Sequence, residues 1–126
     1  MKPHVIALLT NDPAVRETAL QVIPEMRHGL RILQSSRAVF EMLRDRPDDV
    51  DLAVIDLDPG VHGLTVLEAI DHRLPTLVLT SLEENYMKSI AERHGAVGCL
   101  TKPFTDEQLT AAIDHALRAL AAQSEV

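Results

Sequence analysis

The chain alternates between two hydrophobic patterns. Five short apolar runs have the length of a β-strand, and turn or polar residues bound each of them: Val5–Leu9, Leu30–Leu33, Leu52–Ile55, Leu77–Leu79 and Ala96–Leu100. After each run, apolar residues recur three and four positions apart, which is the spacing of the buried face of an amphipathic helix. The pattern therefore predicts a strand–helix unit that is repeated five times.

Capping and helix-breaking residues predict where these helices begin and end. Pro24 is expected to end the first helix, because proline has no backbone N–H to continue the hydrogen bonding. Gly95 is expected just past the end of the fourth helix, where glycine commonly caps a helix. Thr105 or Asp106 is expected to cap the fifth helix. Residues 121–126 are predicted to form a frayed tail or the start of a linker.

Strands that alternate with helices favour an α/β fold. Parallel strands joined by right-handed helical crossovers form a doubly wound sheet, so we expect a five-stranded parallel sheet with helices on both faces. With 126 residues, 46% of them hydrophobic and 25% charged, the chain has the size and composition of a single domain, residues 1–126. In such sheets, ligands bind at the carboxyl ends of the strands.

Charge and composition narrow the classes of function. The chain carries 12 basic residues against 19 acidic ones, a net charge of −7, which argues against binding to a nucleic-acid backbone. Its aromatic residues, Phe40, Tyr86 and Phe104, provide no platform for stacked bases. The longest unbroken apolar run, Val5–Leu9, is far shorter than the roughly 20 residues of a membrane helix. The single Cys99 fits a reducing compartment, so we expect a cytoplasmic protein.

Polar residues gather where four of the predicted strands end. The segments that follow the first, third, fourth and fifth strands are Thr10-Asn11-Asp12-Pro13, Asp56-Leu57-Asp58, Thr80-Ser81 and Thr101-Lys102-Pro103-Phe104. Because these strand ends share one edge of the sheet, acids, a hydroxyl group and a lysine are expected to meet there. In that setting a carboxylate can be a nucleophile toward phosphorus, if a hard cation and a lysine offset the transferred charge.

Four segments in this order, LLTNDPAVRE, DLAVIDLDPG, VLTS and GCLTKPF, resemble the receiver domain of two-component response regulators. The resemblance extends over nearly the whole chain and implies a CheY-like fold. It also implies that a histidine kinase or a phosphotransfer protein phosphorylates an aspartate with the help of Mg²⁺. By position the phosphoacceptor is Asp56, and Thr80 and Lys102 hold the phosphoryl group. The Lys102-Pro103 peptide bond is a candidate for the cis form.

The end of the first strand departs from the family pattern. An acidic pair normally stands there and builds the Mg²⁺ site, whereas this chain has Thr10 and Asn11. The metal ligands implied by the resemblance are therefore Asn11, Asp12, Asp56 and Asp58. Two roles stay open for Asp12, because an aspartate before a proline is also a helix-start signal. Cys99 stands where the family has an aromatic ring that rotates on activation.

The resemblance also implies how a signal is passed on. A phosphoryl group adds about −1.5 to −2 charges at Asp56. Thr80 and Lys102 would then be pulled toward it and shift the helix Tyr86–His94 between two packings. This helix and the last strand–helix unit are the expected surface for a downstream protein. The same elements allow a homodimer.

Two other functions fit some of the same residues. A phosphorylation-independent adaptor with the same fold would explain Thr10, Asn11 and Cys99. The sequence Asp56-Leu57-Asp58 also matches the Asp-x-Asp signature of haloacid-dehalogenase-like phosphatases, in which the second aspartate is a general acid–base. That signature normally ends the first strand of its domain, whereas two strand–helix units precede it here. We therefore expect a signalling switch and not an enzyme, apart from self-catalysed gain and loss of its phosphoryl group.

Overall fold

The structure is a computed structural model that describes residues 3–45, 49–57, 63–81 and 85–124. Strands and helices alternate along the chain as predicted: β1 Val5–Leu9, α1 Pro13–Glu25, β2 Gly29–Leu33, α2 Ser36–Asp45, β3 Leu52–Asp56, α3 Gly63–Ile70, β4 Thr76–Thr80, α4 Asn85–Arg93, β5 Ala96–Thr101 and α5 Asp106–Ser124. The predicted and observed ends of each strand differ by one residue at most, because each hydrophobic run lies within one strand.

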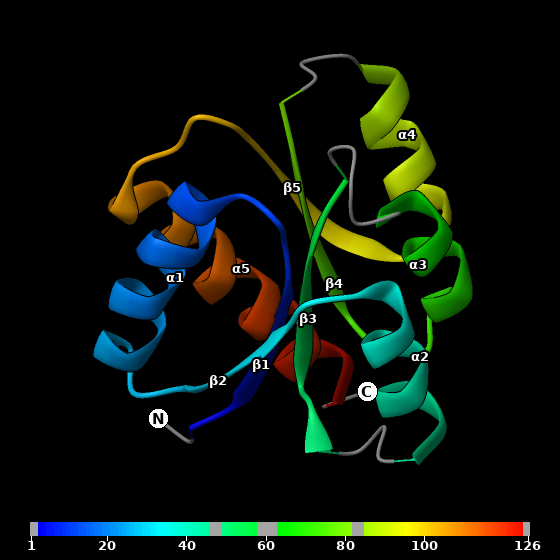
Figure 1. The fold of residues 1–126 in the computed structure, drawn as a ribbon, viewed down its shortest axis with the longest axis horizontal. Helices are drawn as coiled ribbons and strands as arrows, with labels where there is room; N and C mark the ends of the chain where they lie inside the picture. The colour runs from blue at the N-terminus through cyan, green and yellow to red at the C-terminus, as the bar shows by residue number, and fades with distance from the viewer. Residues whose placement is uncertain (1–2, 46–48, 58–62, 82–84, 125–126) are drawn as a thin grey trace.

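The five strands form one parallel sheet in the order β2-β1-β3-β4-β5. Helices α1 and α5 cover one face of this sheet, and α2, α3 and α4 cover the other (Figure 1). The predicted doubly wound α/β fold is confirmed. From β1 the chain passes to β2 on one side and then to β3 on the other, so the strand order switches at β1 and β3. Ligand sites of such sheets lie at the carboxyl ends of the strands beside this switch.

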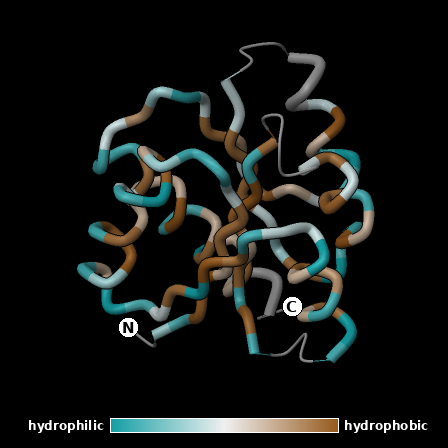
Figure 2. The backbone as a smooth tube through the Cα atoms, viewed as in Figure 1, coloured by the Kyte–Doolittle hydropathy of each residue, from teal (hydrophilic) through white to brown (hydrophobic). Residues whose placement is uncertain are grey.

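Buried hydrophobic clusters lie on both faces of the sheet. Ile6 and Leu8 of β1 pack with residues of α1 and α5, whereas Ala7 and Leu9 pack with residues of α2 and α3. All residues of β3 and β4 are buried, and the strands in the middle of Figure 2 are accordingly hydrophobic. Strands buried on both faces are typical of parallel sheets. Their polar residues are therefore confined to strand ends.

Helix α1 continues one residue beyond Pro24, so the prediction that this proline ends the helix is wrong by one residue. A proline in the last turn removes only one N–H donor, and the turn still closes. The backbone N–H groups of Met26 and Arg27 donate to the carbonyl oxygens of Val22 and Pro24, at 3.0 and 2.9 Å. α1 therefore ends at Glu25.

The ends of α4 and α5 follow from their capping residues. Gly95 has a φ of 90° just after α4, as predicted. Thr105 caps α5, because its Oγ1 accepts the Gln108 N–H at 3.1 Å and the Gln108 side-chain oxygen accepts the Thr105 N–H at 2.8 Å. Residues 121–124 continue α5, since alanine-rich segments favour a helix, and the expected frayed tail or linker start stays a prediction. Within the described ranges, no helix is both long and apolar enough to cross a membrane.

Candidate functional site

The carboxyl ends of β1, β3, β4 and β5 bring polar residues to one edge of the sheet. Asp56 is the last residue of β3, Thr80 is the last residue of β4, and both are buried. Thr10 follows β1 directly and is fully buried. Lys102 follows β5, and its backbone N–H donates to the Thr80 carbonyl oxygen at 2.8 Å. Residues that are far apart in the sequence thus share one small region.

The Asp56 carboxylate accepts hydrogen bonds from the side chains of Thr10 and Lys102. Its Oδ2 accepts a hydrogen bond from Thr10 Oγ1 at 2.6 Å and another from Lys102 Nζ at 2.8 Å. The side chains of Asp56 and Lys102 are 3% and 11% exposed, so this ion pair is largely shielded from water. A buried carboxylate needs such partners, because leaving water without them is costly for a charged group. Thr10 and Lys102 provide them.

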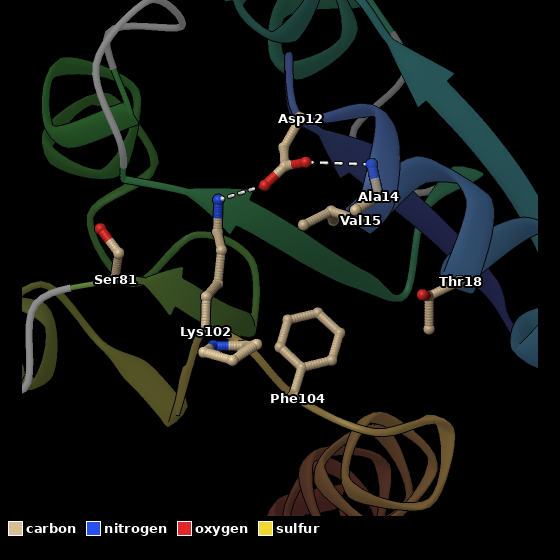
Figure 3. Close-up of a pocket in the computed structure, with 8 residues that line it drawn as sticks. Asp12, Ala14, Val15, Thr18, Ser81, Lys102 and Phe104 are labelled. Carbon is tan, nitrogen blue, oxygen red and sulfur yellow. Dashed lines mark hydrogen bonds and ion pairs between the residues drawn. The ribbon is translucent and has the colours of Figure 1, made fainter.

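Lys102 links two carboxylates. Besides Asp56, its Nζ donates to Asp12 Oδ2 at 3.2 Å. Figure 3 shows the side chains of Asp12 and Lys102 pointing toward one another. The peptide bond between Lys102 and Pro103 is cis, as the resemblance predicts. Lys102 is the cationic centre of a network of Asp12, Lys102 and Asp56.

Asp12 caps α1 and also faces this network. Its Oδ1 accepts the Ala14 N–H at 2.9 Å, and Pro13 is the first residue of the helix. Its Oδ2 points toward Lys102 (Figure 3). Burial by itself raises the pKa of Asp12, but the hydrogen bonds from Lys102 and Ala14 and the lysine charge hold the pKa below its ordinary value. Capping and a place in the site are therefore compatible for one carboxylate.

The remaining predicted residues are placed differently. Thr80 lies one residue beyond Leu79, the partner of Asp56 in the pairing of β3 with β4. Asn11 is exposed in the loop between β1 and α1. Asp58 lies outside the residues that the structure describes. The structure thus brings Asp12, Asp56 and Lys102 into direct contact and places Thr80 beside them.

Thr10 is a site residue that sequence reasoning missed. Its position matches one of the family's acidic pair, but nothing in its local sequence indicates a contact with Asp56. The contact follows from the pairing of β1 with β3, in which Leu9 lies opposite Ile55. Thr10 and Asp56, the residues that follow Leu9 and Ile55 in the sequence, therefore lie side by side. The alignment of these two strand ends is the signal that could have identified Thr10.

The donor set fits Mg²⁺ in chemical type. Among the described residues there is no group of three or more His, Cys, Asp or Glu side chains arranged to hold a metal ion. The carboxylates of Asp12 and Asp56 nevertheless converge on one cation, Lys102 Nζ, and Asn11 adds an amide oxygen to the same loop. Mg²⁺ prefers oxygen ligands and often binds one or two carboxylates, with water and phosphate oxygens as its other ligands. Asp12, Asp56 and Asn11 are donors of this kind.

A groove opens beside Lys102. Its volume is about 360 Å³, and its lining residues are Asp12, Ala14, Val15, Thr18, Ser81, Lys102, Pro103 and Phe104 (Figure 3). Val15, Pro103 and Phe104 form an apolar part of this lining, whereas Asp12 and Lys102 form its charged part. Asp12 and Lys102 are thus accessible from a partly apolar groove.

Comparison with known proteins identifies the family. The model of the response regulator receiver domain matches residues 6–114. The chain belongs to this family. This receiver domain is 32% identical over 119 residues to a glycerol metabolism activator from Pseudomonas putida, with 90% of this chain and 54% of the relative covered. It is 26% identical over 120 residues to the transcriptional regulatory protein FixJ from Bradyrhizobium diazoefficiens, with 93% and 58% covered.

Solved structures share the fold of this receiver domain. NtrX from Brucella abortus matches with a TM-score of 0.85 at 19% identity, over 98% of this chain and 29% of that chain. The signal receiver domain of a LuxO repressor protein from Vibrio parahaemolyticus matches with a TM-score of 0.84 at 15% identity, over 98% and 96%. At these identities the likeness concerns the fold alone. The chain spans little more than half the length of the two relatives named above.

Membership of the family fixes the class of function. Receiver domains are signalling switches that histidine kinases phosphorylate and that interact with downstream effectors, rather than conventional enzymes. The predicted receiver function is confirmed at this level, and neither the adaptor nor the phosphatase alternative is favoured. Relatives such as FixJ and NtrC are transcriptional regulators.

Proposed function

We propose that Asp56 of this receiver domain accepts a phosphoryl group from a phosphohistidine of a histidine kinase or a phosphotransfer protein. One observation carries the proposal: the Asp56 carboxylate is buried at the end of β3, with Lys102 Nζ 2.8 Å from its Oδ2. A carboxylate is a competent nucleophile toward phosphorus when a neighbouring cation offsets the charge of the incoming group. Lys102 is that cation.

The transfer is a displacement at phosphorus. A carboxylate oxygen of Asp56 forms a bond to phosphorus while the P–N bond of the donor breaks. The imidazole nitrogen keeps the electron pair of the broken bond. Lys102 and the hydroxyl group of Thr80 then hold the oxygens of the phosphoryl group, since both residues lie at the same edge of the sheet as Asp56. The groove beside Lys102 would bring the donor to Asp12 and Lys102, the residues next to Asp56.

Asp12, Asp56 and Asn11, together with Asp58, would hold a Mg²⁺ ion at this site. When bound, the cation offsets negative charge on the phosphoryl oxygens. Asp12 can contribute to the site without uncapping α1, because Oδ1 accepts the Ala14 N–H and Oδ2 faces the network. Asp12 therefore compensates in part for the missing acidic pair at the end of β1.

The proposed output surface comprises α4, β5 and α5. The aspartyl phosphate carries about −1.5 to −2 charges next to Lys102, in place of the single negative charge of the Asp56 carboxylate. The bond from the Lys102 N–H to the Thr80 carbonyl oxygen couples any movement of either residue to the ends of β4 and β5. Ala91 of α4 is fully buried in one cluster with Val78 of β4, so α4 lies against the strand that carries Thr80. A downstream protein or a second copy of the chain would bind this surface. The single cysteine of the chain, Cys99, is compatible with a reducing cytoplasm.

The test is a ¹⁵N–¹H spectrum of the protein with Mg²⁺, recorded before and after addition of beryllofluoride, a phosphoryl mimic. We expect shifts centred on Asp56, Thr80 and Lys102 that extend into α4, and none of them in Asp56→Asn. The asparagine is similar in shape but lacks the nucleophilic charge. A wild-type spectrum that does not change would contradict the proposal and leave a phosphorylation-independent adaptor.

A further inference from the structure

The hydroxyl group of Thr10 touches the proposed phosphoacceptor. Resting on the function proposed for Asp56, we infer that Thr10 is a positioning residue: its hydroxyl group fixes the Asp56 carboxylate in the orientation that reacts with the phosphodonor. Thr10 Oγ1 lies 2.6 Å from Asp56 Oδ2, and the two residues are 0% and 2% exposed. A hydrogen bond to a charged acceptor at this distance is short and strong.

The direction of this hydrogen bond is determined by its neighbours. Thr10 Oγ1 also accepts the backbone N–H of Asp12, at 3.0 Å. A hydroxyl group has a single proton to donate, and a carboxylate can only accept. The Thr10 proton therefore points to Asp56, while a lone pair of the same oxygen accepts the backbone N–H of Asp12. One hydroxyl group thus connects the phosphoacceptor with the N-terminal cap of α1.

The backbone around Thr10 keeps this hydroxyl group in place. Thr10 directly follows the buried central strand β1, and Leu9 is paired with Ile55, the residue before Asp56. Threonine is β-branched, so few χ1 rotamers are open to it once it is buried. The carboxylate is therefore held between Thr10 and Lys102 before a donor arrives. Preorganisation of this kind lowers the cost of reaching the reactive geometry.

The test compares two substitutions of Thr10 with a matched control. Thr10→Val removes the hydroxyl group and keeps the shape, and Thr10→Ser keeps the hydroxyl group. Thr76→Val is the control, because Thr76 is also a buried threonine on a central strand, and its Oγ1 donates only to a backbone oxygen, that of Leu74 at 3.0 Å. Each protein is incubated with phosphoramidate and Mg²⁺. Intact-mass spectrometry gives the maximal rate constant and the half-saturating donor concentration, and urea unfolding gives the stability.

We expect Thr10→Val to lower the maximal rate constant about tenfold, the effect of one hydrogen bond to a charged group, with the half-saturating concentration unchanged. Thr10→Ser should restore the rate to within about threefold of wild type, and Thr76→Val should leave it unchanged. A wild-type rate in Thr10→Val, or equal losses in Thr10→Val and Thr76→Val, would overturn the inference while Asp56 remains the acceptor. Absence of phosphorylation in wild type itself, as in Asp56→Asn, would overturn the proposed function and this inference together.

Discussion

At the scale of single residues, each charged group of the site depends on partners that are distant in sequence. Asp56 is 46 positions from both Thr10 and Lys102, and Asp12 is 90 positions from Lys102. A buried charge is tolerated only where such partners stabilise it. Lys102 forms ion pairs with two carboxylates, Asp12 and Asp56, so the position of its Nζ atom determines how their negative charges are offset. Folding of all four strand ends is thus required before the site exists.

A second polar contact lies at the opposite edge of the sheet. The Nδ1 atom of His28 accepts the backbone N–H of His4 at 3.0 Å, and His28 is 7% exposed. Burial, followed by the charge of His4, lowers the pKa of His28 more than Asp114 and Asp51 raise it. A ring nitrogen that accepts a hydrogen bond carries no proton. The folded state therefore favours the neutral imidazole.

We predict that this histidine makes the protein less stable in mild acid. Below about pH 6.5, the ordinary pKa of histidine, the unfolded chain gains a proton at His28 that the folded protein resists. The free energy of unfolding therefore rises with pH through this window and is greatest above it. His28→Asn retains an acceptor near the position of Nδ1 but cannot be protonated. Urea titrations at about pH 5.5 and about pH 7.5 should give a smaller difference for His28→Asn than for wild type. An equal difference in both proteins would assign the effect to another group.

At the scale of elements, the ends of helices are held by turns that lie beside them. At the carboxyl end of α4, the His72 side-chain Nε2 is 3.1 Å from the Arg93 carbonyl oxygen, and His94 Nδ1 is 3.1 Å from Asp71 Oδ1. These contacts join α4 to the turn after α3. The turn itself is in an uncommon conformation, since Asp71 and His72 have φ values of 33° and 70°. The carboxyl end of α4 is thereby joined to this turn, so we expect a movement of this helix to be largest at its amino end.

The start of α3 illustrates how closely an element can approach the site. A Cβ atom on Gly63 would lie 2.8 Å from Leu57 Cα and would collide with the carbonyl oxygen of Asp56. Both neighbours are backbone atoms, which cannot rotate away as the tip of a side chain can. Only glycine therefore allows α3 to begin directly beneath the end of β3.

We predict that Gly63→Ala destabilises the protein by about 1–3 kcal/mol, because the end of β3 must move to admit the methyl group. Gly29→Ala is the matched control, since the nearest atom to its new Cβ would be Val5 Cγ2, at an ordinary 3.6 Å. That substitution should change the stability by less than about 1 kcal/mol. Urea unfolding monitored by circular dichroism measures both effects. Equal stability of the two variants would show that β3 and α3 separate more easily than their contact indicates.

At the scale of the whole molecule, the central sheet joins two cores into one cooperative unit. Successive residues of β1 point to opposite faces, so Leu8 belongs to the core beneath α1 and α5, and Leu9 to the core beneath α2 and α3. Neither core can lose its packing without disturbing the strand that serves both. A change in one core is therefore expected to affect the other.

We predict that Leu8→Ala and Leu9→Ala each lower the free energy of unfolding by about 2–5 kcal/mol, the usual cost of a cavity at a fully buried leucine. Both variants should still unfold in one transition. Amide signals of α1 and of α3, followed in urea by ¹⁵N–¹H spectra, should disappear at the same denaturant concentration in each variant. Separate midpoints for the two helices would contradict a single cooperative unit.

Local signals in the sequence determined the elements, the fold class and the candidate residues of this protein. Hydrophobic spacing marks strands and helices because burial follows the period of each element, and capping groups such as Thr105 and Gly95 act on neighbours a few residues away. The position of Asp56, Thr80 and Lys102 at strand ends is therefore readable along the chain. Pro24 shows the limit of such signals, because the loss of one N–H donor in a last turn does not by itself decide where a helix ends.

Only the tertiary structure decided which of these residues touch. The contact of Thr10 with Asp56 depends on the register of β1 against β3. The contacts of Lys102 with Asp12 and Asp56 depend on the distances from the end of β5 to the start of α1 and to the end of β3. Register and strand order are set by the packing of two cores on both faces of the sheet, which involves residues from the whole chain. No local sequence pattern carries that information, because the energy that selects it is shared among contacts distant in sequence.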